Sequence, residues 1–313
     1  MRYYCIMLNR RQLLKTIGTA SATLALPFHS SALNQQPAAP FRYCLNMATI
    51  RGHKLGLVKE LETASKAGFE LVEIWMDSLQ QYLAGGGKIG DLNKRLKDLN
   101  VEVVNSIGFA RWIADDDAER KNGVEQTKRE MDLLAQIGCK RIAAPPMGAT
   151  EKAGLELDRV AERYRTILEL GDASGVVPLL ELWGFSKNLS RLSEVMYVAI
   201  ESSHKSAEVL LDVYHLYKGG SGINTLSLVG VPPVNILHLN DYTNIAPATI
   251  TDADRLHPGD GIAPIKEILK IFKSAQRPLI ISEEVFNPVY YKQDALEVAK
   301  TALKKMKAVA ASV

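Results

Sequence analysis

The chain has 313 residues, of which 47% are hydrophobic and 23% are charged. These values are ordinary for a globular protein and exclude a disordered, collagen-like or polytopic membrane protein. The formal net charge of +3 has a local origin, because the first 32 residues contain four basic residues and no acidic residue. The rest of the chain has no basic excess, so we expect no nucleic-acid partner.

Residues 1–32 have the pattern of a bacterial export signal. Arg10 and Arg11 precede a short apolar run over residues 16–28, and small residues at 30–32 offer a cleavage site. The paired arginines resemble the twin-arginine signal, which serves proteins that are exported already folded. The apolar run is too short for a membrane span. We therefore expect a periplasmic or otherwise exported protein with no membrane attachment after cleavage.

Residues 33–40 are predicted to be a linker, and residues 41–313 are predicted to form one domain. In this domain short apolar runs alternate with amphipathic helical stripes, such as the 3, 4, 3 spacing of apolar residues from Ile89 to Leu99. Continuous apolar runs are typical of parallel strands that are buried on both faces. The predicted strands are residues 41–47, 70–75, 101–106, 141–144, 177–182, 209–213, 235–239 and 279–284.

Eight strand-then-helix units over about 270 residues predict an α/β fold of the (β/α)8 TIM barrel type. The alternative is an open doubly wound sheet. It is disfavoured because no G-x-G-x-x-G motif follows the first predicted strand. Cys44 and Cys139 fall in or beside strands that are not neighbours in a barrel, so we predict two separate buried thiols.

Polar residues occur where the last four predicted strands end. These residues are Glu181, Asp212, His238 and the pair Glu283-Glu284. The carboxyl ends of barrel strands carry the chemistry of this fold, and buried carboxylates are costly unless a positive group compensates them. Each residue alone could be a cap or a satisfied polar group. Together they predict one bound divalent ion, Mn²⁺ first, with Mg²⁺, Co²⁺, Zn²⁺ or Fe²⁺ as alternatives.

Five short motifs lie at these strand ends and in the loops after them: Leu-Leu-Glu181-Leu-Trp, Leu-Leu-Asp212-Val-Tyr-His215, Leu-His238-Leu-Asn-Asp241, His257-Pro-Gly-Asp-Gly261 and Ser-Glu-Glu284-Val-Phe-Asn. Together, over roughly residues 41–310, the chain resembles the sugar-phosphate isomerase/epimerase group of the xylose isomerase-like barrel superfamily. That group includes ketose 3-epimerases, hydroxypyruvate isomerases and inosose dehydratases.

The resemblance implies a set of ligands and of substrate contacts. Glu284 is preferred to Glu283 because the ligand of the family typically precedes a Val-Phe-Asn-like run. His215 and an arginine after the seventh strand, Arg255, would contact substrate oxygens. The implied metal ligands are Glu181, Asp212, His238 and Glu284.

The resemblance also implies a reaction. Two carboxylates on opposite faces of a carbon next to a carbonyl can exchange a proton through an enediolate, and Glu181 and Glu284 are the candidate catalytic pair. Trp75 and Trp183 are candidates to stack on the sugar, and His257 is a candidate to face the site. Trp112, in a loop after the third strand, is a candidate lid residue.

We therefore expect a divalent-metal-dependent isomerase or epimerase that acts on a small-molecule sugar: a free ketose, a keto-sugar or a related polyol. Export disfavours a phosphorylated substrate, because phosphosugars are mostly cytoplasmic. Two alternatives stay open. One is a metal-assisted sugar dehydratase or lyase, since an enediolate can also expel a β-hydroxyl. The other is a sugar-binding protein without activity.

Overall fold

A computed structural model describes residues 39–230, 233–273 and 278–313. The predicted signal peptide and most of the predicted linker lie outside these residues. The described part belongs to one compact unit, which begins at Pro37 and extends to Val313.

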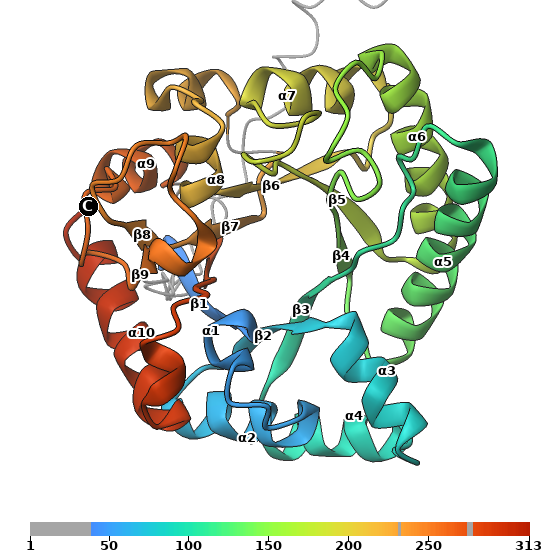
Figure 1. The fold of residues 1–313 in the computed structure, drawn as a ribbon. Helices are drawn as coiled ribbons and strands as arrows, with labels where there is room; N and C mark the ends of the chain where they lie inside the picture. Colours follow the sequence, from blue (N-terminus) through green and yellow to red (C-terminus); the bar gives the residue numbers. More distant parts are fainter. Residues whose placement is uncertain (1–38, 231–232, 274–277) are drawn as a thin grey trace, which may run out of the picture. The chain divides into compact units, whose positions relative to one another are not determined.

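Eight parallel strands form the inner wall of a barrel (Figure 1). Each strand pairs with the next one in the order β3-β2-β1-β10-β7-β6-β5-β4, and the two end strands of this order, β3 and β4, lie in contact. This order confirms the predicted TIM barrel and excludes the doubly wound sheet. All eight predicted strands are present, within two residues at each end. They are β1 (Phe41–Asn46), β2 (Leu71–Trp75), β3 (Glu102–Ile107), β4 (Arg141–Ala144), β5 (Val177–Glu181), β6 (Glu208–Asp212), β7 (Ile236–Leu239) and β10 (Leu279–Glu283).

Helices surround the strands (Figure 1). Gly68 and Gly175 end two of them with φ values of 96° and 72°, a conformation that glycine adopts at little cost. A short antiparallel pair, β8 (Asp241–Tyr242) and β9 (Arg255–Leu256), follows β7.

The described residues contain ten α-helices and three 3₁₀ turns. The α-helices are α1 (Ala48–Arg51), α2 (Leu57–Ala67), α3 (Met76–Ala84), α4 (Ile89–Asp98), α5 (Asp117–Gln136), α6 (Leu157–Ser174), α7 (Leu192–Glu201), α8 (Val213–Lys218), α9 (Ile265–Phe272) and α10 (Ala295–Ala310). The 3₁₀ turns are η1 (Ile223–Leu228), η2 (Asp252–Asp254) and η3 (Tyr290–Lys292).

The alternation of side chains along each strand divides the core into two layers. In β10, Leu279 and Ile281 pack against the surrounding helices, whereas Ile280 belongs to a separate apolar cluster inside the barrel. Leu210 and Ile236 lie in the same inner cluster. The next inward-facing residue along each of these strands lies nearer its carboxyl end, where the apolar cluster stops.

Cys44 and Cys139 are both buried and free, as predicted. Burial raises the pKa of both thiols, so neither is an activated thiolate. Within the described ranges, no helix combines the length and the apolar character needed to cross a bilayer.

Candidate active site

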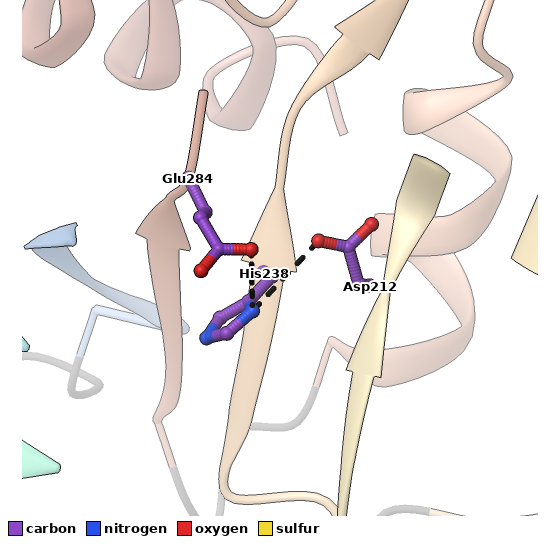
Figure 2. Close-up of side chains that lie close together, drawn as sticks. All are labelled: Asp212, His238 and Glu284. Atoms are coloured by element: carbon purple, nitrogen blue, oxygen red, sulfur yellow. Dashed lines mark ion pairs between the residues drawn. The ribbon is translucent and has the colours of Figure 1, made fainter. Parts of the chain in front are cut away.

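Three side chains at the carboxyl ends of β6, β7 and β10 converge on one point (Figure 2). One ligand atom each from Asp212, His238 and Glu284 lies within 4.8 Å of the other two, and all three residues are buried. The strand register brings them together, because Asp212 pairs with His238 and His238 pairs with Ser282 in β10. Glu284, which directly follows β10, is the next residue after Ser282 to face the barrel interior.

The imidazole of His238 is held in one orientation by Glu73 of β2. His238 Nε2 lies 3.1 and 3.2 Å from the two carboxylate oxygens of Glu73. The other ring nitrogen, Nδ1, lies 3.7 Å from Asp212 Oδ2 and 3.3 Å from Glu284 Oε2. The angles at these contacts do not meet hydrogen-bond geometry, so Nδ1 has no hydrogen-bond partner. Burial lowers the pKa of His238, but Glu73 and Glu284 outweigh burial and raise this pKa well above its usual range.

These donors fit a divalent cation. Two carboxylates and one imidazole are ligands that several divalent transition metals accept. The buried Nδ1 atom of His238 has no hydrogen-bond partner and faces the two carboxylates. A carboxylate on the other ring nitrogen is the usual support of a metal-binding histidine. Asp212, His238 and Glu284 would hold the ion, and Glu73 would orient His238.

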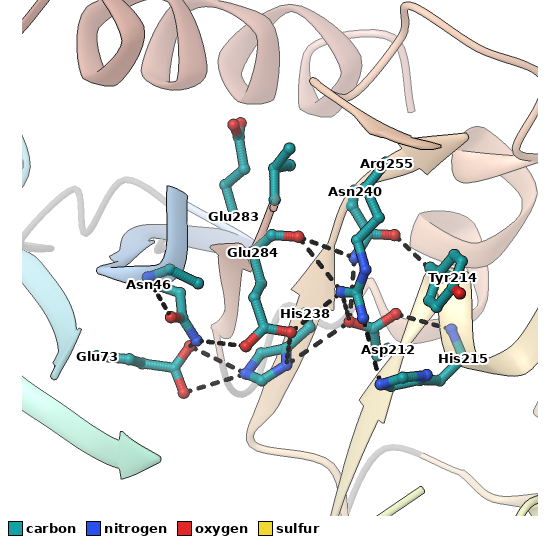
Figure 3. A network of polar contacts seen from close by, with 12 residues as sticks. Asn46, Glu73, Asp212, Tyr214, His215, His238, Asn240, Arg255, Glu283 and Glu284 are labelled. Atoms are coloured by element: carbon teal, nitrogen blue, oxygen red, sulfur yellow. Dashed lines mark hydrogen bonds and ion pairs between the residues drawn. The ribbon is translucent and has the colours of Figure 1, made fainter. Parts of the chain in front are cut away.

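The carboxylate of Glu284 is held on both sides (Figure 3). Asn46 Nδ2 donates a hydrogen bond to Glu284 Oε1 at 3.0 Å, and Arg255 Nη1 donates one to Oε2 at 3.1 Å. Burial raises the pKa of Glu284, but the positive charges of His238 and Arg255 outweigh burial and lower this pKa below its usual value. Glu284 is therefore a carboxylate at neutral pH.

Arg255 is fully buried beside this cluster. Its Nη1 atom lies 2.8 Å from Asp212 Oδ2, and its Nη2 atom lies 2.6 Å from Asp252 Oδ1. The guanidinium also lies over the ring of Tyr214, 4.3 Å from the centroid. Burial lowers the pKa of Arg255, but the carboxylates of Asp212, Asp252 and Glu284 hold it above its usual value. The cluster thus has a permanent positive charge next to two of its ligands.

His215 lies between Asp212 and Arg255. Its backbone N–H donates to Asp212 Oδ1 at 2.9 Å, which also caps α8. Its ring atom Nε2 lies 3.2 Å from Arg255 Nη2. Because arginine only donates, this ring nitrogen accepts. Burial lowers the pKa of His215 to about 3, so the ring is neutral. The structure thus places both predicted substrate contacts, His215 and Arg255, beside the ligand cluster.

Glu181 lies near this cluster but is not part of it in the described residues. In the register of β5 on β6, Glu181 is opposite Leu210 and not opposite Asp212. The predicted fourth ligand, Glu181, thus lies beside the three clustered residues, and its role as a ligand stays a prediction. Glu181 Oε2 is buried without a hydrogen-bond partner. Burial, strengthened by the nearby Glu284 carboxylate, raises the pKa of Glu181 to about 8.

A cavity of about 280 Å³ opens in front of Glu181 and Glu284. Half of its lining residues are aromatic, and they include Trp75 and Trp183, the two predicted stacking residues. The rings contact one another along the wall: Trp75 and Trp183 each lie 5.1 Å from a neighbouring phenylalanine ring. The other aromatic lining residues are Phe109, Phe185 and Phe286.

His257 does not line this cavity. Its Nδ1 atom lies 2.6 Å from Glu283 Oε1, and its ring stacks on Tyr290 at 4.1 Å. Glu283 follows the alternation of β10 and points away from Glu284, toward the surrounding helices (Figure 3). His257 therefore supports the outer side of β10. The predicted lid residue Trp112 is also elsewhere: it is buried in the core and donates to the carbonyl of Pro145.

Sequence reasoning missed the amide side chains that hold the carboxylates. Asn105 Nδ2 donates to Glu73 at 2.6 Å, and Asn240 Nδ2 donates to Asp212 at 3.0 Å. Asn46 at the end of β1 has the same role for Glu284. The sequence does contain a signal for these residues, namely an asparagine within or directly after a predicted buried strand. A buried amide is costly unless it is hydrogen-bonded, so such an asparagine indicates a polar partner nearby.

A larger groove of about 450 Å³ lies outside the barrel, between α7 and η1. Its lining is mainly apolar and includes the exposed residues Ile200 and Leu228. Arg191 is the one charged residue of its described lining. Acid–base chemistry is therefore assigned to the smaller cavity, where Glu181 and Glu284 lie.

Several curated proteins are similar to this chain. An inosose isomerase of Halalkalibacterium halodurans is 27% identical over 265 residues, which are 83% of this chain and 93% of that protein. A Bacillus velezensis inosose isomerase is 26% identical over 273 residues, 86% of this chain and 96% of that protein. The 3-dehydro-D-guloside 4-epimerase of Escherichia coli is 26% identical over 145 residues, 41% of this chain and 55% of that protein. These relatives support an isomerase or epimerase enzyme.

Solved structures share the fold. The IOLI protein, solved with a bound zinc atom, superposes with a TM-score of 0.81 and 23% identity, over 87% of this chain and 99% of that one. L-ribulose 3-epimerase superposes with a TM-score of 0.69 and 17% identity, over 87% of this chain and 95% of that one.

The family model described as xylose isomerase-like TIM barrel matches residues 61–309. This match agrees with the barrel and with the relatives, and it confirms the resemblance drawn from the strand-end motifs. The chain therefore belongs to the xylose isomerase-like TIM barrel family.

Proposed function

We propose that this protein is a divalent-metal-dependent isomerase or epimerase of a neutral keto-polyol, such as an inosose, a free ketose or a keto-sugar. The observation that carries the proposal is the cluster of Asp212, His238 and Glu284 beside Glu181, whose buried Oε2 atom has no hydrogen-bond partner. The names of the inosose isomerase relatives support a polyol substrate, and the zinc of the IOLI structure supports a divalent ion. The ligand types still favour Mn²⁺, Zn²⁺ or Fe²⁺ without selecting one.

The charges at the cavity favour a neutral substrate. The described lining contains no lysine or arginine, whereas Glu181, Asp252 and Glu284 are acidic. Arg255, which lies beside the ligand cluster, already contacts three carboxylates. A phosphate or carboxylate group would meet no free positive side chain there, so we expect unphosphorylated substrates to bind better. The aromatic walls offer apolar faces on which the C–H side of a sugar or polyol ring can stack.

The residues of the cavity have distinct parts in such a reaction. Asp212, His238 and Glu284 would hold the divalent cation, which would supply Lewis-acid polarisation of a carbonyl oxygen and so acidify the neighbouring C–H group. Glu181 can take and return the proton, because one of its oxygens has no other partner. Arg255 adds positive charge beside the enediolate oxygens.

The test is isotope exchange in D₂O with the metal-reconstituted enzyme and a panel of inososes, free ketoses, keto-sugars and their phosphates. We expect deuterium at the carbon next to the carbonyl of a neutral substrate, together with an isomeric product. Glu181→Gln should reduce turnover by about 10²–10⁴-fold, the usual contribution of an acid–base group.

The same panel separates the rivals. A dehydrated product would replace the isomerase with a lyase, and tight sugar binding without any exchange would support a binding protein. Preference for phosphorylated substrates would contradict the charge argument. As a matched control, Glu102→Gln changes an exposed glutamate at the opposite end of β3 and should leave turnover unchanged.

We also propose that the protein is exported through its twin-arginine-type signal. Arg10 and Arg11 before the short apolar run support this proposal. Replacing both arginines with lysine should retain the precursor in the cytoplasm, as measured by fractionation and by the mass of the N-terminus. Export of the double variant at the normal rate, or an uncleaved N-terminus in the exported protein, would contradict the proposal.

A further inference from the structure

We infer that Asp252 sets the charge selectivity of the cavity, because its carboxylate covers one edge of the Arg255 guanidinium and so prevents an anionic substrate group from binding there. This inference rests on the proposed function and deepens it, since it assigns the preference for a neutral polyol to one residue. Asp252 is then a specificity-determining residue that acts through Arg255 and not on the reacting atoms.

Asp252 lies on the wall of the cavity, and Arg255 lies behind it. Asp252 lines the cavity, and its side chain is 45% exposed. Arg255 is absent from the described lining, and its side chain is 1% exposed. Asp252 Oδ1 lies 3.0 Å from Arg255 Nε and 2.6 Å from Arg255 Nη2. The carboxylate therefore separates this edge of the guanidinium from the cavity.

The N–H groups of Arg255 are divided between the ligand cluster and Asp252 (Figure 3 shows the cluster side). Nη1 donates to Asp212 at 2.8 Å and to Glu284 at 3.1 Å. Nε donates to Asp252, whereas Nη2 donates to Asp252 and lies 3.2 Å from His215 Nε2. The edge formed by Nε and Nη2 can bind two oxygens of a phosphate, sulfate or carboxylate group at once. Asp252 occupies this edge.

Other contacts hold Arg255 in place. Its guanidinium lies over the ring of Tyr214, 4.3 Å from the centroid. Its backbone pairs with Tyr242 in the β8–β9 pair, and its carbonyl accepts a hydrogen bond from Asn287 Nδ2 at 3.0 Å. None of these contacts uses the Asp252 side chain. Removal of that carboxylate should therefore leave the guanidinium in position, with its Nε and Nη2 donors open to the cavity.

The turn that carries Asp252 is held by a different carboxylate. Asp254 Oδ2 accepts hydrogen bonds from the backbone N–H and the hydroxyl of Thr251, both at 2.8 Å, and these bonds cap η2. The ion pairs of Arg255 within the described ranges are with Asp212, Asp252 and Glu284, and not with Asp254. The chain thus offers two neighbouring carboxylates, one that covers Arg255 and one that does not.

Asp252 also suits a neutral substrate. Its Oδ1 atom accepts both hydrogen bonds from Arg255, so its Oδ2 atom remains as an acceptor on a half-exposed side chain. A carboxylate oxygen on the wall can accept a hydrogen bond from a hydroxyl group, whereas it repels a phosphate or carboxylate group. One side chain therefore favours a polyol and disfavours its anionic derivatives.

The first test measures anion binding without turnover. The probe is sulfate, which carries two negative charges like a phosphate monoester, and it is titrated by calorimetry into the Mn²⁺-reconstituted protein. Asp252→Ala should bind sulfate at least about 10-fold more tightly than the wild type, because two charged N–H donors become available. Asp252→Ser removes the same carboxylate with a smaller loss of polarity and should give the same gain.

Asp254→Ala is the matched control. It removes the same charge two residues away without uncovering Arg255, so its sulfate affinity should stay within about twofold of the wild type. Sulfate that binds the metal ion contributes equally to all of these proteins. No gain in either Asp252 variant, or an equal gain in Asp254→Ala, would overturn the inference. Thermal unfolding checks that each variant is folded.

The second test locates the anion. A crystal structure of Asp252→Ala in sulfate should show sulfate oxygens within hydrogen-bond distance of Arg255 Nε and Nη2. Sulfate bound at the metal alone would overturn the inference, because the gain in affinity would then not come from the uncovered edge of the guanidinium.

The third test links the selectivity to turnover of neutral ketoses and their phosphates. In Asp252→Ala, the kcat/KM of the phosphorylated substrate relative to the neutral one should rise at least about 10-fold. For the neutral substrate, KM should rise more than kcat falls. An unchanged ratio would overturn the inference. Inactivity of the wild type on every substrate would count against the proposed function instead, and the sulfate titration would still decide the role of Asp252.

Discussion

The two ends of the barrel interior are built from the same strands and have opposite chemistry. In β6, Leu210 and Asp212 both face inward, and in β7, Ile236 and His238 do the same. The first residue of each pair belongs to the inner apolar cluster, and the second belongs to the ligand cluster. The lining of the interior therefore changes from apolar side chains to metal-ligand side chains over two residues, or about 7 Å, along each strand.

The two ends of the barrel interior contribute differently to folding stability and to function. The apolar end is close-packed, so its side chains contribute through burial and through the absence of cavities. The polar end holds buried charges whose mutual attraction mainly offsets the cost of removing them from water. Substitutions at the first end should therefore affect unfolding, and substitutions at the second end should affect metal binding and turnover.

The largest expected effect is at the polar end. Asp212→Ala removes one of the three ligands, and we expect the metal content to fall from about one ion per chain to nearly none, with an affinity loss of more than about 100-fold. Elemental analysis after reconstitution and dialysis measures the content. Full occupancy in this variant would show that the metal is held elsewhere.

Leu210→Ala tests the apolar end of the same strand. It removes a fully buried side chain and leaves a cavity, so the free energy of unfolding should fall by about 2–5 kcal/mol. Denaturant titration measures this loss. Metal affinity should stay near the wild-type value, because Leu210 belongs to the inner apolar cluster and not to the ligand cluster. A large loss of metal affinity with little loss of stability would contradict the assignment of the apolar end to stability and of the polar end to metal binding.

Glu60 of α2 is a buried carboxyl outside both the apolar cluster and the ligand cluster of the barrel interior. It therefore shows what burial does to a carboxyl group. It is 4% exposed, and its Oε2 atom has no hydrogen-bond partner. Burial raises its pKa from 4.5 to about 7, against the opposing charge of Arg51 and with a smaller contribution from Asp77. The fold therefore favours the protonated form, and the cost of ionisation grows as the pH rises from 4.5 to 7.

Glu60→Gln should remove this cost. We expect no stabilisation at pH 4 and a gain of about 2–3 kcal/mol in the free energy of unfolding at pH 8. Denaturant titrations of both proteins at the two pH values measure the difference. A gain of the same size at pH 4 would show that the effect is not the ionisation of Glu60.

The sequence alone determined the fold and most members of the site. Buried parallel strands give continuous apolar runs, and the helices between them give 3.6-residue stripes, so the eight strands were predictable within two residues. A polar residue at the end of an apolar run is a local signal, and it identified Glu181, Asp212, His238 and the pair Glu283-Glu284, of which the family resemblance selected Glu284. The strand alternation that separates Glu284 from Glu283 follows from the same period of two.

Only the tertiary structure decided which of these residues meet. The offset of β5 on β6 places Glu181 opposite Leu210, and no local pattern encodes an offset between strands. Asn46, Glu73 and Arg255 approach the cluster from β1, β2 and β9, so their roles depend on barrel closure. Arg255 contacts three carboxylates and His257 turns to Glu283 because buried polar groups pair with whatever the packed fold brings near.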